Sequence, residues 1–266
     1  MMISVSGFHF HLEVRGSGKP IVCLHGFAED LSTWGSITLD KYQMVLIDLP
    51  GHGQSDKPEM MEQYRLPIVI DHLHALIRYL DLQAYTLMGY SMGGRIALSY
   101  TLAYPNEVDR LILESSSYGE CGILSRYKRR RNDAELARKI QENGIEWFER
   151  FWAEQSIFQT QSTLPPQIRQ KIKERRLQNE THALANTLLA NGQGTFPCLK
   201  RRMDHIKVPI LYICGEKDHK YRKIGSAMQC RNKNTVTSII TSAGHNTHIE
   251  RPELFTEAVT RFLNKD

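Results

Sequence analysis

Residues 84–98 read AYTLMGYSMGGRIAL, in which a G-x-S-x-G pentapeptide stands between an apolar run and a helix-like stretch. This is the strand, sharp turn and helix context of a nucleophile elbow. The serine at the turn is held in a strained backbone conformation, so only glycine fits where strand and helix approach it most closely. The pattern predicts that Ser91 is exposed at the carboxyl end of a sheet strand and faces a pocket.

Two later segments supply partners for this serine. A serine hydroxyl reacts only when a histidine takes its proton and an acid fixes the tautomer of that histidine. Asp218 follows the apolar run 208–215, and His245 follows the next strand-like run, 235–240. The chain order Ser, Asp, His is the order of the α/β-hydrolase fold, and carboxyl ends of parallel strands are where such sheets place their sites. We therefore predict the catalytic set Ser91, Asp218 and His245.

Three other residues compete for these roles. Asp48 also ends a strand, but it precedes the serine and is better explained as the anchor of its own turn. Glu216 is the weaker alternative acid, two residues before Asp218. His248 lacks the preceding glycine that lets the His245 loop turn inward.

An oxyanion hole needs two backbone N–H groups aimed at the place where negative charge develops. One comes from the residue after the nucleophile, Met92. The other is expected from a loop after an earlier strand, and residues 20–27 read PIVCLHGF, a strand followed by a His-Gly-Phe turn. Phe27 is the predicted second donor.

The order of the remaining segments predicts an α/β fold with a mostly parallel sheet flanked by helices. Strands are expected at 8–14 (antiparallel), 21–24, 44–47 and 108–113, and helices at 64–80 and 252–263. Between residues 118 and 206 the alternation stops and the pattern becomes helical, with breaks at Gly144, Pro165-Pro166 and Gly192 to Gly194. We expect a core domain of residues 1–117 and 207–266 and a helical cap of residues 118–206 inserted into it.

Bulk composition excludes several classes of protein. The chain has 266 residues, 41% of them hydrophobic, which is enough for a large core. No apolar run reaches the roughly 18 residues that a membrane helix needs, and the first residues lack a signal core, so a cytoplasmic protein without a membrane partner is expected.

The five cysteines are scattered and suggest neither a disulfide framework nor a metal site; we expect them to be reduced. No metal and no cofactor is predicted, and the sequence leaves monomer and homodimer open.

Positive charge is concentrated in the cap. Residues 118–206 hold 16 Lys and Arg against 10 Asp and Glu, a net of +6, while the whole chain has 34 against 29, a net of +5. The rest of the chain is therefore close to neutral, at −1. Arginine binds carboxylates in a bidentate manner, so a cationic cap over a reactive serine favours an anionic small-molecule substrate. The charged side chains of a run such as residues 128–131 cannot all face the site, so part of this charge is expected to be solvated. No nucleic-acid-binding module is recognisable in the sequence, so no nucleic-acid partner is expected.

With these motifs in place, the chain resembles α/β-hydrolase-fold proteins over essentially its full length. Its cap resembles that of the bacterial 2-succinyl-6-hydroxy-2,4-cyclohexadiene-1-carboxylate synthase family, on Trp152, residues 157–161 (IFQTQ), Arg176 ahead of residues 183–185 (ALA), and residues 192–195 (GQGT) before Pro197. Residues 214–218 (CGEKD) with Tyr221, residues 243–248 (AGHNTH) and Tyr90 in the elbow are also similar to that family. The family's proline before the hydrophobe-Phe pair is Ser156 here.

The resemblance implies a lyase of menaquinone biosynthesis that removes pyruvate from 2-succinyl-5-enolpyruvyl-6-hydroxy-3-cyclohexene-1-carboxylate. Ser91 would then act as a base, not as a nucleophile. The substrate carries several carboxylates, in agreement with the charge count of the cap. The family's substrate-binding residues correspond to Tyr90, Arg126, Trp152 and Arg176, with Arg95 as a further anion-binding candidate and Arg129 or Arg130 as alternatives to Arg126.

Two other functions remain in competition. A carboxylesterase or carbon–carbon bond hydrolase would use Ser91 through an acyl-enzyme, and fast cleavage of a nitrophenyl ester without pyruvate release would favour it. A binding protein on a hydrolase scaffold would need no reactive serine, and a rate of pyruvate release unchanged in Ser91→Ala would favour that reading.

Overall fold

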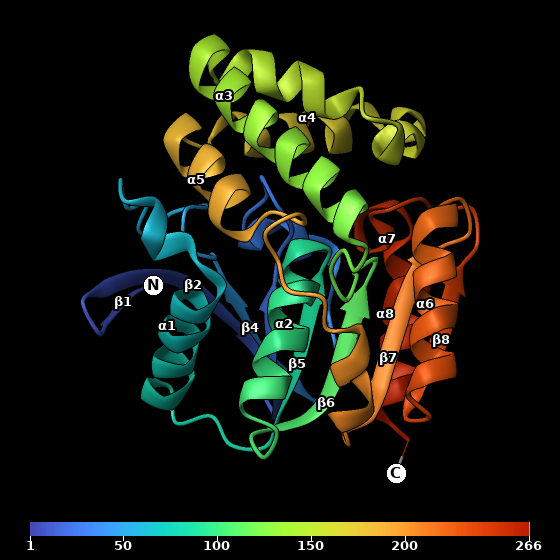
Figure 1. Ribbon diagram of the computed structural model, residues 1–266. Coiled ribbons are helices and arrows are strands. Elements are labelled where there is room, and N and C mark those ends of the chain that lie inside the picture. The colour runs from blue at the N-terminus through green and yellow to red at the C-terminus, as the bar shows by residue number, and fades with distance from the viewer. Residues whose placement is uncertain (266) are drawn as a thin grey trace.

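The computed structural model describes residues 1–265, which form one eight-stranded sheet with helices on both faces and a helical layer above one edge (Figure 1). The strands are β1 (Met2–Val5), β2 (Phe8–Gly16), β3 (Lys19–Leu24), β4 (Tyr42–Ile47), β5 (Tyr85–Tyr90), β6 (Val108–Glu114), β7 (Ile210–Gly215) and β8 (Thr235–Ile240). The α-helices are α1 (Leu66–Tyr79), α2 (Met92–Ala103), α3 (Ile123–Ala153), α4 (Pro166–Leu177), α5 (Thr181–Asn191), α6 (His219–Arg231), α7 (Thr247–Glu250) and α8 (Pro252–Leu263). Short 3-10 helices are η1 (Leu31–Ser36), η2 (Met61–Tyr64), η3 (Ser156–Thr163) and η4 (Lys200–His205).

The strand order is β1-β2-β4-β3-β5-β6-β7-β8. β1, β2 and β4 pair antiparallel, and every pair from β4 through β3, β5, β6 and β7 to β8 is parallel. This confirms the predicted α/β-hydrolase fold with a mostly parallel sheet. The sequence did not predict β1, which has only four residues.

The sheet is buried on both faces because its central strands alternate between two cores. On β3, Val22 and Leu24 join the core beneath α1, α2 and α6, whereas Ile21 and Cys23 join the core that contains η1 and α8. A strand buried on both faces reads as a continuous apolar run, which is how it appears in the sequence. The parallel strands all end at the same edge, and the loops that leave this edge lie under the cap.

The segment between β6 and β7 is helical and covers the carboxyl edge of the sheet (Figure 1). It contains α3, η3, α4 and α5, and α3 packs closely against α5. Gly144 interrupts α3 with φ 83° and ψ 178°, a backbone conformation that side-chain-bearing residues rarely adopt. A small cap core of Ala137, Ile140, Phe148 and Leu188 continues onto Ala28 of the loop after β3, so the cap is packed directly on a loop of the site.

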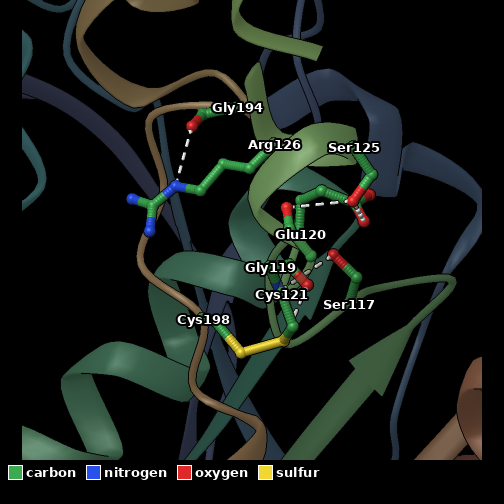
Figure 2. Close-up of a disulfide and its surroundings, with 9 residues drawn as sticks. Ser117, Gly119, Glu120, Cys121, Ser125, Arg126, Gly194 and Cys198 are labelled. Carbon is green, nitrogen blue, oxygen red and sulfur yellow. Dashed lines mark hydrogen bonds between the residues drawn. A yellow bond between two sulfur atoms is a disulfide. The ribbon is translucent and has the colours of Figure 1, made fainter. Parts of the chain in front are cut away.

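One expectation about the cysteines is wrong. Cys121 and Cys198 form a disulfide with Cα atoms 5.0 Å apart, across 77 residues of sequence (Figure 2). The two residues meet because the chain leaves the core for the cap near Cys121 and returns near Cys198. Their spacing in the sequence carries no sign of this, because it only reflects the length of the cap. Cys23 and Cys214 are free and buried, as expected of packing residues, and Cys230 is free and exposed.

Candidate active site

Ser91 lies in a strained turn between β5 and α2, with φ 49° and ψ −102°. The flanking glycines permit the turn because no side chain fits beside them. A Cβ atom on Gly89 would lie 2.5 Å from the Gly93 carbonyl, and one on Gly93 would lie 2.3 Å from the Leu24 carbonyl oxygen. The Ser91 N–H donates to the Glu114 carbonyl at 2.8 Å, which ties the turn to β6.

The structure brings Ser91, His245 and Asp218 together. His245 Nε2 lies 3.1 Å from Ser91 Oγ, and His245 Nδ1 lies 2.6 Å from Asp218 Oδ2. The His245 and Asp218 side chains are almost fully buried, and Asp218 also accepts from the Tyr221 N–H at the start of α6. In this arrangement the carboxylate holds Nδ1 as the donor, which leaves Nε2 free to take the serine proton.

The three competing residues have other partners. Asp48 accepts from the Leu31 and Gln54 N–H groups, so it anchors the loops around it, as the sequence suggested. His248 is fully buried and bonded through both ring nitrogens, Nδ1 to Glu114 at 2.6 Å and Nε2 to Thr33 at 2.7 Å. Glu216 is exposed and accepts from the Ser242 N–H at 2.9 Å.

Phe27 and Met92 both line the cavity that contains Ser91. Within residues 1–265, neither backbone N–H donates to a protein acceptor in its loop. The Gly93 N–H instead donates to the His25 carbonyl, which holds the loop after β3 against the start of α2. Two free N–H groups beside a serine can stabilise a developing oxyanion.

The cavity has a volume of about 560 Å³ and lies between the sheet edge and the cap. Its walls include Tyr90 from the elbow, and Trp152 and Phe158 from the cap. The Trp152 ring packs edge-on against Phe27 with centroids 5.5 Å apart, so it lines the cavity and fastens the cap to the loop after β3. Burial raises the pKa of Tyr90 well above its ordinary value, so this phenol stays neutral.

Arg95 and Arg176 line the same cavity and are both buried. Arg95 donates to the Asn191 carbonyl at 3.1 Å and lies over the Phe196 ring; burial lowers the pKa of its guanidinium to about 10. Arg176 donates to Gln161 Oε1 at 3.1 Å, and burial lowers its pKa in the same way. Within residues 1–265, no carboxylate lies within ion-pair distance of either group. Buried cations that form no ion pair are suited to bind anions.

Arg126 does not line the cavity. Its guanidinium donates to the Gly194 and Thr195 carbonyls at 3.1 Å each, on the segment that returns from the cap (Figure 2 shows the Gly194 bond). Arg129, one helical turn further along α3, lines the cavity and is paired with Asp133 at 2.7 Å. Of the three arginines that the sequence left open, Arg129 is the one that lines the cavity. Arg130 is exposed and is not part of the cavity wall.

Two residues of the cavity wall were not singled out from the sequence. Glu29, two residues after Phe27, is buried; its Oε1 accepts from Asn246 Nδ2 at 2.9 Å, and its Oε2 has no hydrogen-bond partner among residues 1–265. Lys220, two residues after Asp218, adds another cation. Their position directly after the predicted oxyanion loop and the predicted acid was the available signal.

Within residues 1–265, no cluster of His, Cys, Asp and Glu side chains is suited to hold a metal ion. None of the helices in the same part of the chain is both long and apolar enough to cross a membrane.

Comparison with known proteins identifies the family of the chain. The alpha/beta hydrolase fold family matches residues 19–252. The putative 2-succinyl-6-hydroxy-2,4-cyclohexadiene-1-carboxylate synthase of Bacillus subtilis (strain 168) is 35% identical, over 94% of this chain and 92% of its own. The structure of MenH from S. aureus is 34% identical, with a TM-score of 0.89 over 95% of this chain and 97% of its own. A thermophilic esterase from Thermogutta terrifontis, 23% identical with a TM-score of 0.85 over 99% and 97% of the two chains, shares the fold. The chain belongs to the alpha/beta hydrolase fold family and, within it, to the family of 2-succinyl-6-hydroxy-2,4-cyclohexadiene-1-carboxylate synthases.

Proposed function

We propose that this protein is a lyase of menaquinone biosynthesis that eliminates pyruvate from 2-succinyl-5-enolpyruvyl-6-hydroxy-3-cyclohexene-1-carboxylate. The product is the compound named in its relatives, 2-succinyl-6-hydroxy-2,4-cyclohexadiene-1-carboxylate. The observation that carries the proposal is the pair of buried guanidinium groups, Arg95 and Arg176, that share a cavity with Ser91 and have no carboxylate partner. A substrate with several carboxylates can form the ion pairs that these two guanidinium groups lack.

The chemistry begins with proton removal. His245 takes the Ser91 proton through Nε2, and the serine oxygen removes the ring proton next to the succinyl carbonyl. Asp218 stabilises the imidazolium that forms. The electron pair delocalises into the carbonyl, and the resulting oxyanion accepts hydrogen bonds from the Phe27 and Met92 N–H groups. As the electrons return, the ring gains its second double bond, the carbon–oxygen bond to the enolpyruvyl group breaks, and pyruvate leaves as its enolate.

Binding roles follow from the positions of the remaining residues. Arg95 and Arg176 hold carboxylates of the substrate, while Tyr90 and Trp152 supply flat apolar walls for the ring. Arg129, rather than Arg126, is the third arginine of the site. Asp133 neutralises part of the Arg129 charge, so this residue contributes less to anion binding than the two unpaired arginines.

Two assays on one preparation test the proposal. Pyruvate formed from the enolpyruvyl substrate is measured by coupling to NADH oxidation, and hydrolysis of a simple nitrophenyl ester is followed by absorbance. We expect fast pyruvate release and slow ester hydrolysis. Rapid ester hydrolysis without pyruvate would reject the lyase and favour a hydrolase that acts through an acyl-enzyme on Ser91.

A further inference from the structure

The two connections between core and cap lie side by side and are fastened to each other. The leading segment, residues 115–122, runs from β6 to α3, and the returning segment, residues 192–199, runs from α5 to η4. Besides the disulfide, the Leu199 N–H donates to the Tyr118 carbonyl at 2.7 Å. Gly119 packs directly on the Pro197 carbonyl, leaving no room for a side chain. We call these two joined segments, residues 115–122 and 192–199, the hinge clasp. The Cys121–Cys198 bond is its covalent link (Figure 2).

The returning segment and the residue before it also reach the active site. The carbonyl of Asn191, the last residue of α5, accepts from Arg95, and Gln193 donates to the Tyr221 hydroxyl at 2.9 Å. Tyr221 packs on His245 with ring centroids 4.5 Å apart. A change in the hinge clasp can therefore be transmitted to the substrate cavity through a few direct contacts.

One cysteine of the disulfide is exposed, and it borders a cationic groove. Cys121 is exposed, whereas Cys198 is half-buried. A groove of about 590 Å³ borders Cys121, and its charged wall residues are Lys200, Lys220, Lys223 and the acid Glu120, together with His219. Excess positive charge beside an exposed cysteine favours approach by an anion.

From the exposed position of Cys121 and the lysine-lined groove, we infer that Cys121–Cys198 is a thiol–disulfide exchange site for an anionic, low-molecular-weight thiol. The thiolate attacks Cys121 Sγ, a new sulfur–sulfur bond forms, and the Cys121–Cys198 bond breaks. The electron pair leaves on Cys198, which takes up a proton. A second molecule of the thiol then attacks the mixed disulfide, leaving two protein thiols and one small-molecule disulfide. The two electrons come from the two thiols.

Exchange breaks the covalent link between the two segments and leaves the Leu199–Tyr118 hydrogen bond and the packing of Gly119 on Pro197. We expect looser positioning of the returning segment and hence weaker substrate binding, with little effect on the chemical step. The exchange itself does not depend on the reaction that the enzyme catalyses. Its effect on substrate binding rests on the proposed function.

The first experiment measures exchange alone, on the intact oxidised protein. Reduction is followed by mass spectrometry with 2-mercaptoethanesulfonate, an anionic thiol, and with cysteamine, a cationic thiol, at equal thiolate concentrations. We expect the anionic thiol to react at least 5-fold faster. The double variant Lys200→Gln, Lys223→Gln should lose most of this preference, whereas the control Lys207→Gln, Lys233→Gln, at exposed positions outside the groove, should keep it. Equal rates for the two thiols, or a preference that survives in the groove variant, would overturn the proposal.

The second experiment locates the adduct. Oxidised glutathione is added to the Cys198→Ser variant, in which Cys121 is a free thiol, and the modified peptides are identified. We expect the adduct on Cys121 to form faster than the adduct on Cys230, which is exposed, free and outside the groove, and so serves as an internal control. Preferential modification of Cys230 would contradict the groove as the recognition element.

The third measurement separates the hinge effect from the proposed function. Kinetics of pyruvate release are compared for the oxidised, the reduced and the reoxidised enzyme. A KM that rises about 3-fold on reduction and returns on reoxidation, with kcat nearly unchanged, supports the coupling. An unchanged KM in protein shown to be reduced would overturn the coupling while leaving the exchange chemistry in place. Absence of pyruvate in every state would instead refute the proposed function.

Discussion

Ser91 and His245 are 154 residues apart in the sequence, yet Ser91 Oγ lies 3.1 Å from His245 Nε2. The elbow after β5 and the loop after β8 produce this contact because both leave the same edge of the sheet. The other ring nitrogen, 2.6 Å from Asp218 Oδ2, completes a continuous path for charge stabilisation from serine to acid. Predictions for the active site follow from the contacts among Ser91, His245 and Asp218. They also follow from Arg95 and Arg176, which line the same cavity.

Replacing the acid should impair the reaction severely. Asp218→Asn cannot hold His245 in the required tautomer, so kcat for pyruvate release should fall by about 10³- to 10⁴-fold. Glu216→Gln is the matched control, since the Glu216 side chain is exposed and, within residues 1–265, accepts only from the backbone N–H of Ser242. Equal losses in the two variants, measured by the coupled pyruvate assay, would mean that the acid has been misassigned.

A pair of arginines on α3 should separate binding from structure. Arg129→Gln removes a cation from the cavity wall, and we expect KM to rise about 5- to 30-fold, the range of roughly 1 to 2 kcal/mol for a partly neutralised charge. Arg126→Gln removes two hydrogen bonds to the returning segment and should lower the free energy of unfolding by about 1 to 2 kcal/mol while changing KM less than 3-fold. Steady-state kinetics and chemical denaturation give both quantities. The reverse pattern would place Arg126 in the site.

Arg176 should carry more of the binding energy because, among residues 1–265, no carboxylate forms an ion pair with it. Arg176→Ala should lower kcat/KM by about 30- to 1,000-fold, corresponding to roughly 2 to 4 kcal/mol of lost transition-state binding. Arg138→Ala is the control, since Arg138 is exposed on α3 and pairs with Glu135 and Glu142. A catalytic efficiency unaltered in Arg176→Ala would reject the carboxylate assignment.

Stability should fall in mild acid because of His52. Burial lowers the pKa of this imidazole from 6.5 to about 3, and its neutral form has Nδ1 3.1 Å from the Pro50 carbonyl, with Nε2 unpartnered. The unfolded chain binds the proton at higher pH than the folded one, so the contribution of His52 is complete above about pH 6.5 and is lost progressively as the pH falls toward 3.

The His52→Asn variant tests this contribution, since its amide can still donate to the Pro50 carbonyl. Between pH 6.5 and 5, the wild-type protein should lose about 1 to 2 kcal/mol more of its unfolding free energy than the variant does. Denaturant titrations of both proteins at several pH values give the two curves. Parallel curves would show that His52 does not carry the pH dependence.

The sequence was most informative where one local pattern determines one geometry. The glycines around Ser91 admit only a tight turn, and the apolar runs 208–215 and 235–240 end where Asp218 and His245 begin, so both the fold and the proximity of these three residues could be predicted. The alternative histidine illustrates the limit of that reasoning. His248 has both ring nitrogens bonded inside the core, and only the packing around Trp34 and Glu114 reveals it.

Features that depend on how the cap meets the core could not be predicted. The pairing of Cys121 with Cys198 requires the leading and returning segments to lie side by side, and no local pattern encodes that. The choice between Arg126 and Arg129 depends on where α3 begins relative to the carbonyls of residues 194 and 195, which the sequence does not fix to within one turn. Glu29 was missed for a related reason, since its burial follows from cap packing over the loop after β3.

The claim that Ser91 acts as a base beneath an anion-binding cap is tested most directly in a single turnover. Excess enzyme is mixed with the enolpyruvyl substrate, pyruvate is quantified over time, and the intact protein mass is recorded at each quench, for wild type and for Ser91→Ala. We predict that wild type releases one equivalent of pyruvate with no mass increase, and that Ser91→Ala is slower by at least about 10³-fold. A covalent adduct on Ser91 that forms and decays with the product, or an undiminished rate in Ser91→Ala, would contradict the account.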